Sequence, residues 1–152
     1  MIDIIKTETI NITMLDDICR RLSNKCVGLS GRYKLTTIHL TDDATQADID
    51  AMQSVFDGYG VAQIEAVPES ITANDTDVST ITALVNASNT YVVFTVFDTD
   101  NVMQMESDSI ATSAGVAVYE FKTALPGLYT IRCYGTITNE TGFIDVEATN
   151  GV

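Results

Sequence analysis

Few residues in this chain have the types and spacing that catalysis requires. His39 is the only histidine, and it lies in an alternating stretch, residues 33–41, that predicts a β-strand. A histidine in such a strand is more often a packing residue than a base or a ligand, and no motif places a partner cluster beside it. The sequence also lacks a Gly-x-Ser-x-Gly motif, a glycine-rich phosphate loop and paired Cys or His ligands. We therefore predict no catalytic residues, no cofactor and no enzyme.

The three cysteines, Cys19, Cys26 and Cys133, make an odd count without a CxxC pair. The first two lie in one segment, and Cys133 lies on a predicted core face. A disulfide between sheets would need a second cysteine near Ile81 or Thr82, where there is none. We predict three reduced thiols, with Cys133 acting as a small core hydrophobe.

The best candidate for a metal site is the acidic stretch from Asp98 to Asp108. It departs from the EF-hand pattern because Met103 takes the glycine position and Ser109 takes that of the final carboxylate. Carboxylates in loops between strands are usually solvated turn formers, so we predict no metal, with calcium as the alternative. Paired acids could also hydrolyse glycosides, but the chain has no Trp and few aromatic residues to hold a sugar.

The sequence predicts a small α+β domain over residues 1–67, and its helices and strands would position the first of these residues. Residues 1–12 look extended, and Thr13 can cap a helix whose apolar positions follow at helical spacing up to Leu22. Residues 28–31 read as a loop, and residues 33–41 as a strand. Thr45 caps a second helix that ends near Gly58 or Gly60, and residues 61–67 form a short strand. A domain of this size is marginally stable alone, so we expect it to bind a partner or copies of itself.

The composition shifts at Pro68 to Thr, Ser, Val, Asn and Asp without a convincing helix. Strands are expected at residues 70–73, 78–85, 91–97, 101–106, 116–122, 128–134 and 142–149. Seven short strands separated by turns predict an all-β immunoglobulin-like sandwich over residues 68–152. Alternation predicts these inward-facing residues: Val78, Ile81, Ala83, Val85, Val92, Phe94, Val96, Val116, Val118, Phe121, Phe143 and Val146.

A turn followed by a tyrosine marks one end of this sandwich. Pro126 presets φ and Gly127 accepts positive φ, so the pair predicts a tight turn before a strand. Tyr129 stands just inside that strand, where the tyrosine corner of immunoglobulin-like domains lies. We predict such a corner, with an ordinary buried tyrosine as the alternative. Either one is a structural feature and not an active site.

Charge is distributed unevenly along the chain, whose net charge is −13. Residues 1–34 hold six basic side chains against four acidic ones, whereas the rest holds two against 17. The resulting net charges are +2 and −15, and an acidic surface of this kind repels phosphate, so we predict no nucleic-acid binding. No apolar run approaches the length needed to span a bilayer, and the start lacks the pattern of a secretory signal. We therefore expect no membrane contact.

Two pieces of the sequence, covering about half the chain, resemble bacterial and phage immunoglobulin-like domains of the Big/invasin type. Residues 70–83, Ser-Ile-Thr-Ala-Asn-Asp-Thr-Asp-Val-Ser-Thr-Ile-Thr-Ala, are similar to the opening hairpin of that family. Residues 115–121 together with 126–131 are similar to its closing strands. The sequence departs from the family where Asn74 is followed by Asp75 in place of glycine. The motifs are specific for fold and much less so for function.

The resemblance implies a bacteriophage virion protein, made in the host cytoplasm and located on the capsid surface. The first expectation is a head decoration (cement, or auxiliary capsid) protein that docks on the major capsid protein, on copies of itself, or on both. The docking residues would be Arg20, Arg21, Lys25, Arg32 and Lys34, or alternatively the apolar Met14, Leu15 and Tyr33. A tail, baseplate or fibre component, or a surface adhesin module that binds a host-cell glycan, is the alternative.

Overall fold

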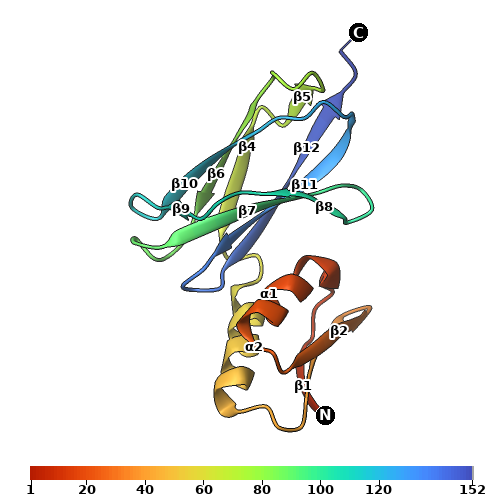
Figure 1. Cartoon of the computed structure of the whole chain (residues 1–152), viewed down its shortest axis with the longest axis vertical. Coiled ribbons are helices and arrows are strands. Elements are labelled where there is room, and N and C mark those ends of the chain that lie inside the picture. The colour runs from red at the N-terminus through yellow and green to blue at the C-terminus, as the bar shows by residue number, and fades with distance from the viewer. Residues whose placement is uncertain (152) are drawn as a thin grey trace. The chain divides into compact units, whose positions relative to one another are not determined.

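A computed structural model describes residues 1–151 and divides the chain into two compact units, which meet in sequence between Asp57 and Gly58. The first unit contains β1 (Ile2–Lys6), the 3-10 helix η1 (Ile12–Met14), α1 (Asp16–Leu22), β2 (Cys26–Arg32), β3 (Leu35–Leu40) and α2 (Gln46–Gly58, which ends one residue into the second unit) (Figure 1). Its three strands form an antiparallel sheet in the order β1-β3-β2.

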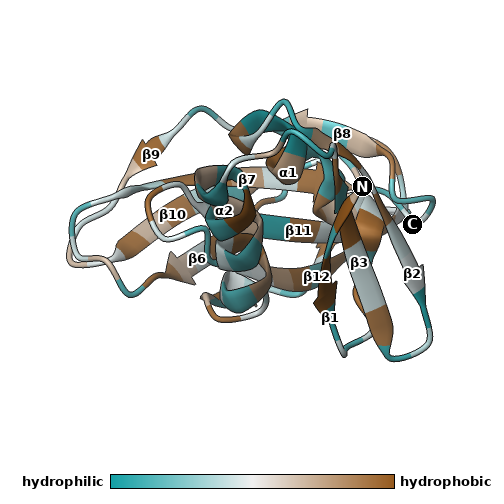
Figure 2. Cartoon of the chain, turned by 90° about the horizontal axis from the view of Figure 1, so that it is seen from below, coloured by the Kyte–Doolittle hydropathy of each residue, from teal (hydrophilic) through white to brown (hydrophobic). Residues whose placement is uncertain are grey.

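The core of this unit comes from one face of the sheet and one side of each helix. Ile4 lies opposite Ile38 in the β1–β3 pair, and both are buried. The helices add the buried residues Leu15, Ile18, Cys19, Met52, Val55 and Phe56. Figure 2 shows the two-sided character of α2, whose hydrophilic residues dominate the side turned to the viewer. The other face of the sheet carries polar residues, among them Asp3 and His39, together with the exposed Ile5.

Two local predictions for this unit are wrong. Thr13 does not cap α1; it lies inside η1, and the N-cap of α1 is Leu15, which makes no side-chain cap hydrogen bond. The predicted loop at residues 28–31 is part of β2, with Leu29 opposite Ile38 and a register shift next to Gly28. Glycines are typical of turns, but here pairing with β3 keeps the backbone extended. A bulge accommodates the register shift next to Gly28.

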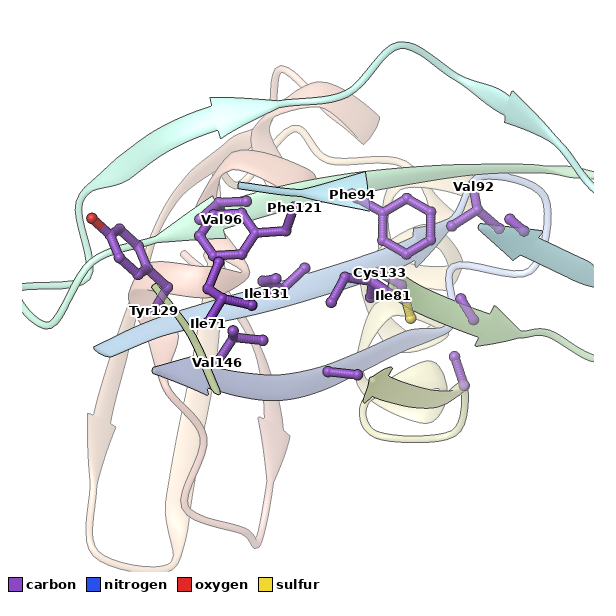
Figure 3. Close-up of a cluster of buried hydrophobic side chains, with 14 of the residues drawn as sticks. Ile71, Ile81, Val92, Phe94, Val96, Phe121, Tyr129, Ile131, Cys133 and Val146 are labelled. Atoms are coloured by element: carbon purple, nitrogen blue, oxygen red, sulfur yellow. The ribbon is translucent and has the colours of Figure 1, made fainter. Parts of the chain in front are cut away.

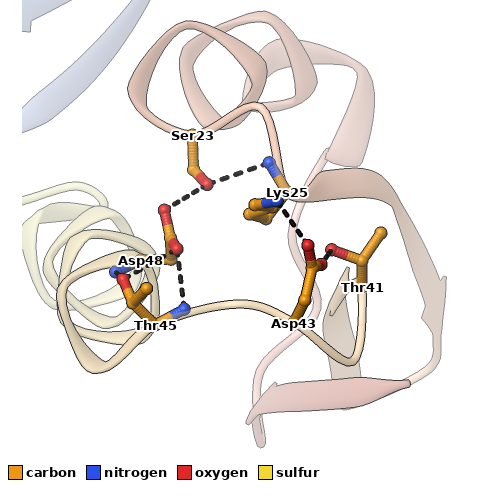
Figure 4. Close-up of polar contacts among 6 residues, drawn as sticks. All are labelled: Ser23, Lys25, Thr41, Asp43, Thr45 and Asp48. Carbon is orange, nitrogen blue, oxygen red and sulfur yellow. Dashed lines mark hydrogen bonds and ion pairs between the residues drawn. The ribbon is translucent and has the colours of Figure 1, made fainter.

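The start of α2 is fixed by a capping box, which Figure 4 shows with its neighbours. The Asp48 backbone N–H donates to Thr45 Oγ1 (3.3 Å), and the Thr45 N–H donates to Asp48 Oδ2 (2.8 Å). Ser23 Oγ donates to the other Asp48 oxygen (2.7 Å), so the end of α1 is tied to the start of α2. Beside it, Lys25 Nζ lies 2.6 Å from Asp43 Oδ2.

The unit boundary lies ten residues before the predicted one. Strand β4 (Gln63–Val67) pairs antiparallel with β6 (Ser79–Leu84), and Figure 1 shows it within the sandwich. The sequence predicts residues 61–67 as the last strand of the first domain, but β4 belongs to the second unit because it pairs with β6. Pro68 lies between two strands of the sandwich and does not separate domains.

The second unit is a β-sandwich with two sheets. Its further strands are β5 (Ser70–Thr72), β7 (Tyr91–Phe97), β8 (Met103–Glu106), β9 (Ile110–Ala111), β10 (Val116–Phe121), β11 (Gly127–Gly135) and β12 (Thr141–Thr149). One sheet has the order β10-β6-β4 and the other β5-β12-β11-β7-β8, with β9 also pairing with β7. All pairs are antiparallel except β5 with β12. This arrangement is an immunoglobulin-like sandwich.

Sixteen buried residues from both sheets form the sandwich core, most of which Figure 3 shows. Most of the predicted inward residues belong to it, including Ile81, Phe94 and Val146. Val116 and Val118 do not, because β10 turns Ala117 and Phe121 inward and leaves both valines exposed. Phe143 lies opposite Arg132 and contacts the ring of Tyr59 (5.4 Å between centroids), and Val78 is half-buried outside the cluster.

No helix within residues 1–151 is both long and apolar enough to cross a membrane.

Candidate functional site: a basic hairpin tip and a Ser–His–Asp relay

The turn between β2 and β3 presents two cations and an aromatic ring. Lys34 adopts φ +58° in this turn, and its backbone N–H donates to Thr9 Oγ1 (2.8 Å). Tyr33 is 81% exposed, and Lys34 Nζ lies 5.2 Å from the centroid of its ring. Arg32 is exposed on the other side of Tyr33. The turn therefore displays Arg32, Tyr33 and Lys34, which we call the hairpin tip.

The other three predicted docking cations are held by acids of their own unit. Arg20 Nε lies 2.7 Å from Asp16 Oδ2, and Arg21 Nη2 lies 3.6 Å from Asp17 Oδ2, both at i,i+4 spacing on α1. Lys25 pairs with Asp43 as described above. Arg32 and Lys34 form no ion pair within residues 1–151. Of the five predicted residues, these two retain free cationic groups.

Docking through Met14 and Leu15 is not supported, because both side chains are buried in the first unit, 3% and 0% exposed. Their spacing suits a helix face, but that face is turned inward by η1 and the start of α1. Tyr33 is the one member of this apolar set that reaches the surface.

His39 has partners on both ring nitrogens, contrary to the prediction that it is a packing residue. Its Nδ1 lies 2.8 Å from Asp3 Oδ1, and its Nε2 lies 2.7 Å from Ser30 Oγ. The three side chains thus form a continuous carboxylate–imidazole–hydroxyl relay. His39 is only 26% exposed and Asp3 47% exposed, whereas Ser30 lies at the surface.

The sheet register explains why these three residues meet. Asp3 lies directly opposite His39 in the β1–β3 pair, and Gly28 lies opposite His39 in the β2–β3 pair. Ser30 is two residues from Gly28 and therefore on the same face. Ser30 lies opposite Thr37, two residues from His39 on β3, so the hydroxyl and the imidazole are diagonal neighbours. Sequence reasoning missed this relay, since only the pairing of three strands identifies the partners.

The tyrosine and turn at the end of the sandwich form the contacts of a corner. The Tyr129 hydroxyl donates to the carbonyl oxygen of Leu125 (2.8 Å) and lies 3.3 Å from Thr123 Oγ1. Its ring packs against Phe121 at 5.2 Å between centroids, with 6% of the residue exposed. Gly127 adopts φ +155° after Pro126. These residues close the core and offer no reactive group.

The carboxylates between residues 98 and 108 do not converge. Asp98 Oδ1 accepts the backbone N–H groups of Asp100 and Val102 (2.9 and 3.0 Å), and its Oδ2 accepts from Gln104 Nε2 (2.7 Å). Asp98 therefore acts as a turn former. No group of three or more His, Cys, Asp or Glu side chains that could hold a metal ion occurs in residues 1–151.

The three cysteines are free thiols, and all are buried. Burial raises the pKa of Cys19 to about 12 and that of Cys133 to about 12, and it also raises the pKa of Cys26. The thiolate is the reactive form of cysteine, so none of these groups is activated as a nucleophile.

The two units differ in net charge. The first contains six basic and nine acidic side chains, a net charge of −3, whereas the second contains two basic and 12 acidic ones, a net charge of −10. The sandwich therefore has the larger excess of acidic side chains. The hairpin tip is a local group of cations in the first unit, which is acidic as a whole.

No protein-family model matches this chain, and no curated protein matches it. Solved structures with a partial likeness include the CARDB domain of the PF1109 protein from Pyrococcus furiosus, crystallised with di-metal ions (13% identity, TM-score 0.38, 59% of this chain and 91% of that one). They also include the PKD domain of an M14-like peptidase from a Thermoplasmatales archaeon (11%, 0.39, 60% and 95%) and a superoxide reductase from Ignicoccus hospitalis (13%, 0.40, 58% and 80%). CARDB and PKD domains are themselves immunoglobulin-like β-sandwiches. Likeness at this level assigns neither family nor function.

Proposed function

We propose that this chain is a structural protein of a bacteriophage particle: a head decoration protein that attaches by its first unit and displays its acidic sandwich. The observation that carries this proposal is the position of the unpaired cations. Arg32 and Lys34 flank the exposed Tyr33 on one turn, whereas Arg20, Arg21 and Lys25 are used in internal ion pairs. Such a role requires no catalysis.

The partner that suits the hairpin tip is a carboxylate-lined protein surface, which we assign to the major capsid protein. Arg binds carboxylates with two parallel hydrogen bonds, and exposed tyrosines are enriched at protein interfaces. A phosphate backbone is a poorer partner, because the chain as a whole carries a net charge of −13. The displayed sandwich, with its net charge of −10, would keep particles soluble at high surface density.

The sequence also supports the proposal of a structural protein of a bacteriophage particle. The resemblance of residues 70–83, 115–121 and 126–131 to Big/invasin-type domains implies a virion protein, and residues 58–151 form a sandwich of the immunoglobulin-like type. Within that sandwich the Tyr129 corner and the Asp98 turn are explained as structural features.

Quantitative mass spectrometry of purified particles from the source that encodes this chain tests the role. Copies in proportion to the major capsid protein would support decoration of the head. A handful of copies per particle would instead favour a tail, baseplate or fibre component, for which host-surface binding is the next question. Absence from the particles would overturn the virion proposal.

The docking surface is tested separately by adding purified chain to particles that lack it. We expect Arg32→Glu to weaken binding about tenfold or more, since it reverses one of the two charges at the tip. The matched control is Lys122→Glu, which makes the same charge change at an exposed position of the sandwich and should bind like the parent. Equal binding by both variants would show that the particle recognises another surface.

A further inference from the structure

The relay of Asp3, His39 and Ser30 has the order and the contacts of a nucleophilic site. A serine nucleophile requires a base within hydrogen-bond reach, and the base requires a third group that orients it. Ser30 Oγ lies 2.7 Å from His39 Nε2, and His39 Nδ1 lies 2.8 Å from Asp3 Oδ1, so both requirements are met. Sites of this kind are recognised by geometry and roles and occur on unrelated folds.

The surface beside Ser30 has room for a small substrate. A cavity of about 290 Å³ is lined by Ser30, Gly31, Arg32, Leu35 and Thr37. Leu35 lies opposite Arg32 in the register, so the cavity combines an apolar side chain with a cation. It adjoins the nucleophile itself, since Ser30 is one of the lining residues.

Negative charge that develops on a substrate oxygen can be stabilised here by Arg32. This residue is two residues from Ser30 on the same strand, shares its face and lines the same cavity. A guanidinium is one of the donors that stabilise an oxyanion.

We propose that Asp3, His39 and Ser30 form an acyl-transfer site that hydrolyses esters of small acyl groups. Ser30 Oγ attacks the ester carbonyl carbon while His39 Nε2 takes the hydroxyl proton. The tetrahedral intermediate collapses, and His39 returns that proton to the departing alcohol oxygen. Water then attacks the acyl–Ser30 ester, giving its proton to His39, and the carboxylic acid leaves as Ser30 is restored. One ester and one water become one acid and one alcohol, without any redox change.

Asp3 is a positioning residue in this reaction. Its carboxylate accepts the Nδ1–H of His39, which selects the tautomer that leaves Nε2 free to take a proton, and it stabilises the imidazolium that follows. The activity goes beyond the proposed structural role and does not depend on it: a chain absent from phage particles could still carry it.

The test uses the full chain with p-nitrophenyl acetate and a fluorophosphonate probe. We expect one stoichiometric burst of p-nitrophenolate per chain, and peptide mass spectrometry should locate the acyl group or the phosphonate on Ser30. Ser30→Ala and His39→Gln should each lower the rate by about 10²-fold or more. Asp3→Asn should lower kcat with little change in KM, and Asp3→Glu should recover part of the loss. Ser109→Ala, at an exposed serine of the sandwich, is the matched control and should keep full activity.

Two results would overturn the proposal. In the first, the probes label lysines or tyrosines of the unaltered chain and leave Ser30 unmodified. This would show that the hydrogen bonds of the relay are structural and do not activate Ser30 as a nucleophile. Turnover that persists in Ser30→Ala would place the chemistry elsewhere. The labelling experiment needs no variant, so it remains decisive even if a substitution impairs folding. Neither result bears on the copy number in particles, which tests the structural role alone.

Discussion

The Tyr129 hydroxyl donates a hydrogen bond to the carbonyl oxygen of Leu125, 2.8 Å away, across the turn that contains Pro126 and Gly127. The contact joins the start of β11 to the loop before it and gives a buried hydroxyl a partner. The ring meanwhile covers Phe121 at the end of the core. One side chain thus couples the geometry of a surface turn to the packing of the sandwich.

Removing that hydroxyl should destabilise the sandwich. Tyr129→Phe leaves the Leu125 carbonyl without this donor while keeping the ring, so we expect the free energy of unfolding to fall by about 1 kcal/mol. Urea denaturation of the full chain measures the change. Tyr91→Phe is the control, because Tyr91 is 52% exposed, and its stability should match that of the parent. Equal effects of the two substitutions would argue against a structural role for the corner.

The capping box of α2 should stabilise the first unit. In Thr45→Ala the helix loses the side-chain acceptor for the Asp48 N–H, and we expect a loss of about 1 kcal/mol. Thermal unfolding followed by circular dichroism provides the measurement. Thr7→Ala changes an exposed threonine of the same unit and should leave the melting temperature unchanged. A variant at Thr45 that melts like the parent would show that the cap contributes nothing.

Acid should destabilise the first unit through Asp48 and Asp43. Hydrogen bonds from Ser23 and from Thr45 lower the pKa of Asp48 below its ordinary 3.8, and the hydrogen bond from Lys25 lowers that of Asp43. Because the folded-state pKa is the lower one, the stabilisation is complete above the ordinary value and is lost as pH falls through the lowered value.

Melting temperatures between pH 7 and pH 2 test this effect. Asp48→Asn should be less stable than the parent at pH 7 and should lose less stability on acidification. In Ser23→Ala the pKa of Asp48 should rise, which carboxyl carbon NMR measures directly. A parallel acid profile for the parent and Asp48→Asn would exclude Asp48 as a source of acid sensitivity.

The cysteines should resist thiol reagents while the protein is folded. Cys19 and Cys133 are both 0% exposed, and burial raises the pKa of each to about 12, so their thiolate fraction at neutral pH is very small. We expect negligible reaction with Ellman's reagent at pH 8 and release of three thiols after addition of guanidinium chloride. Rapid reaction of Cys133 before denaturation would indicate that the sandwich opens readily.

The sequence predicted most of the second unit because its strands are short, alternate clearly and are separated by strong turn signals. Residues 91–97 form the strand expected there, and Tyr129 stands where the turn before it indicated. The helix after Thr45 was predictable for the same reason, since its cap and apolar stripe are local signals. Local patterns predict local structure well when the chain around them agrees.

Tertiary structure decided the rest. Which residues of β10 face inward depends on its pairing with β6, and whether residues 63–67 belong to the sandwich depends on a partner strand that comes later in the chain. The relay requires Asp3, Ser30 and His39 to come together from three strands, at separations of up to 36 residues. Local periodicity predicts strands but not their partners or register, and these pairings place the relay on one face and leave Arg32 and Lys34 exposed at the turn.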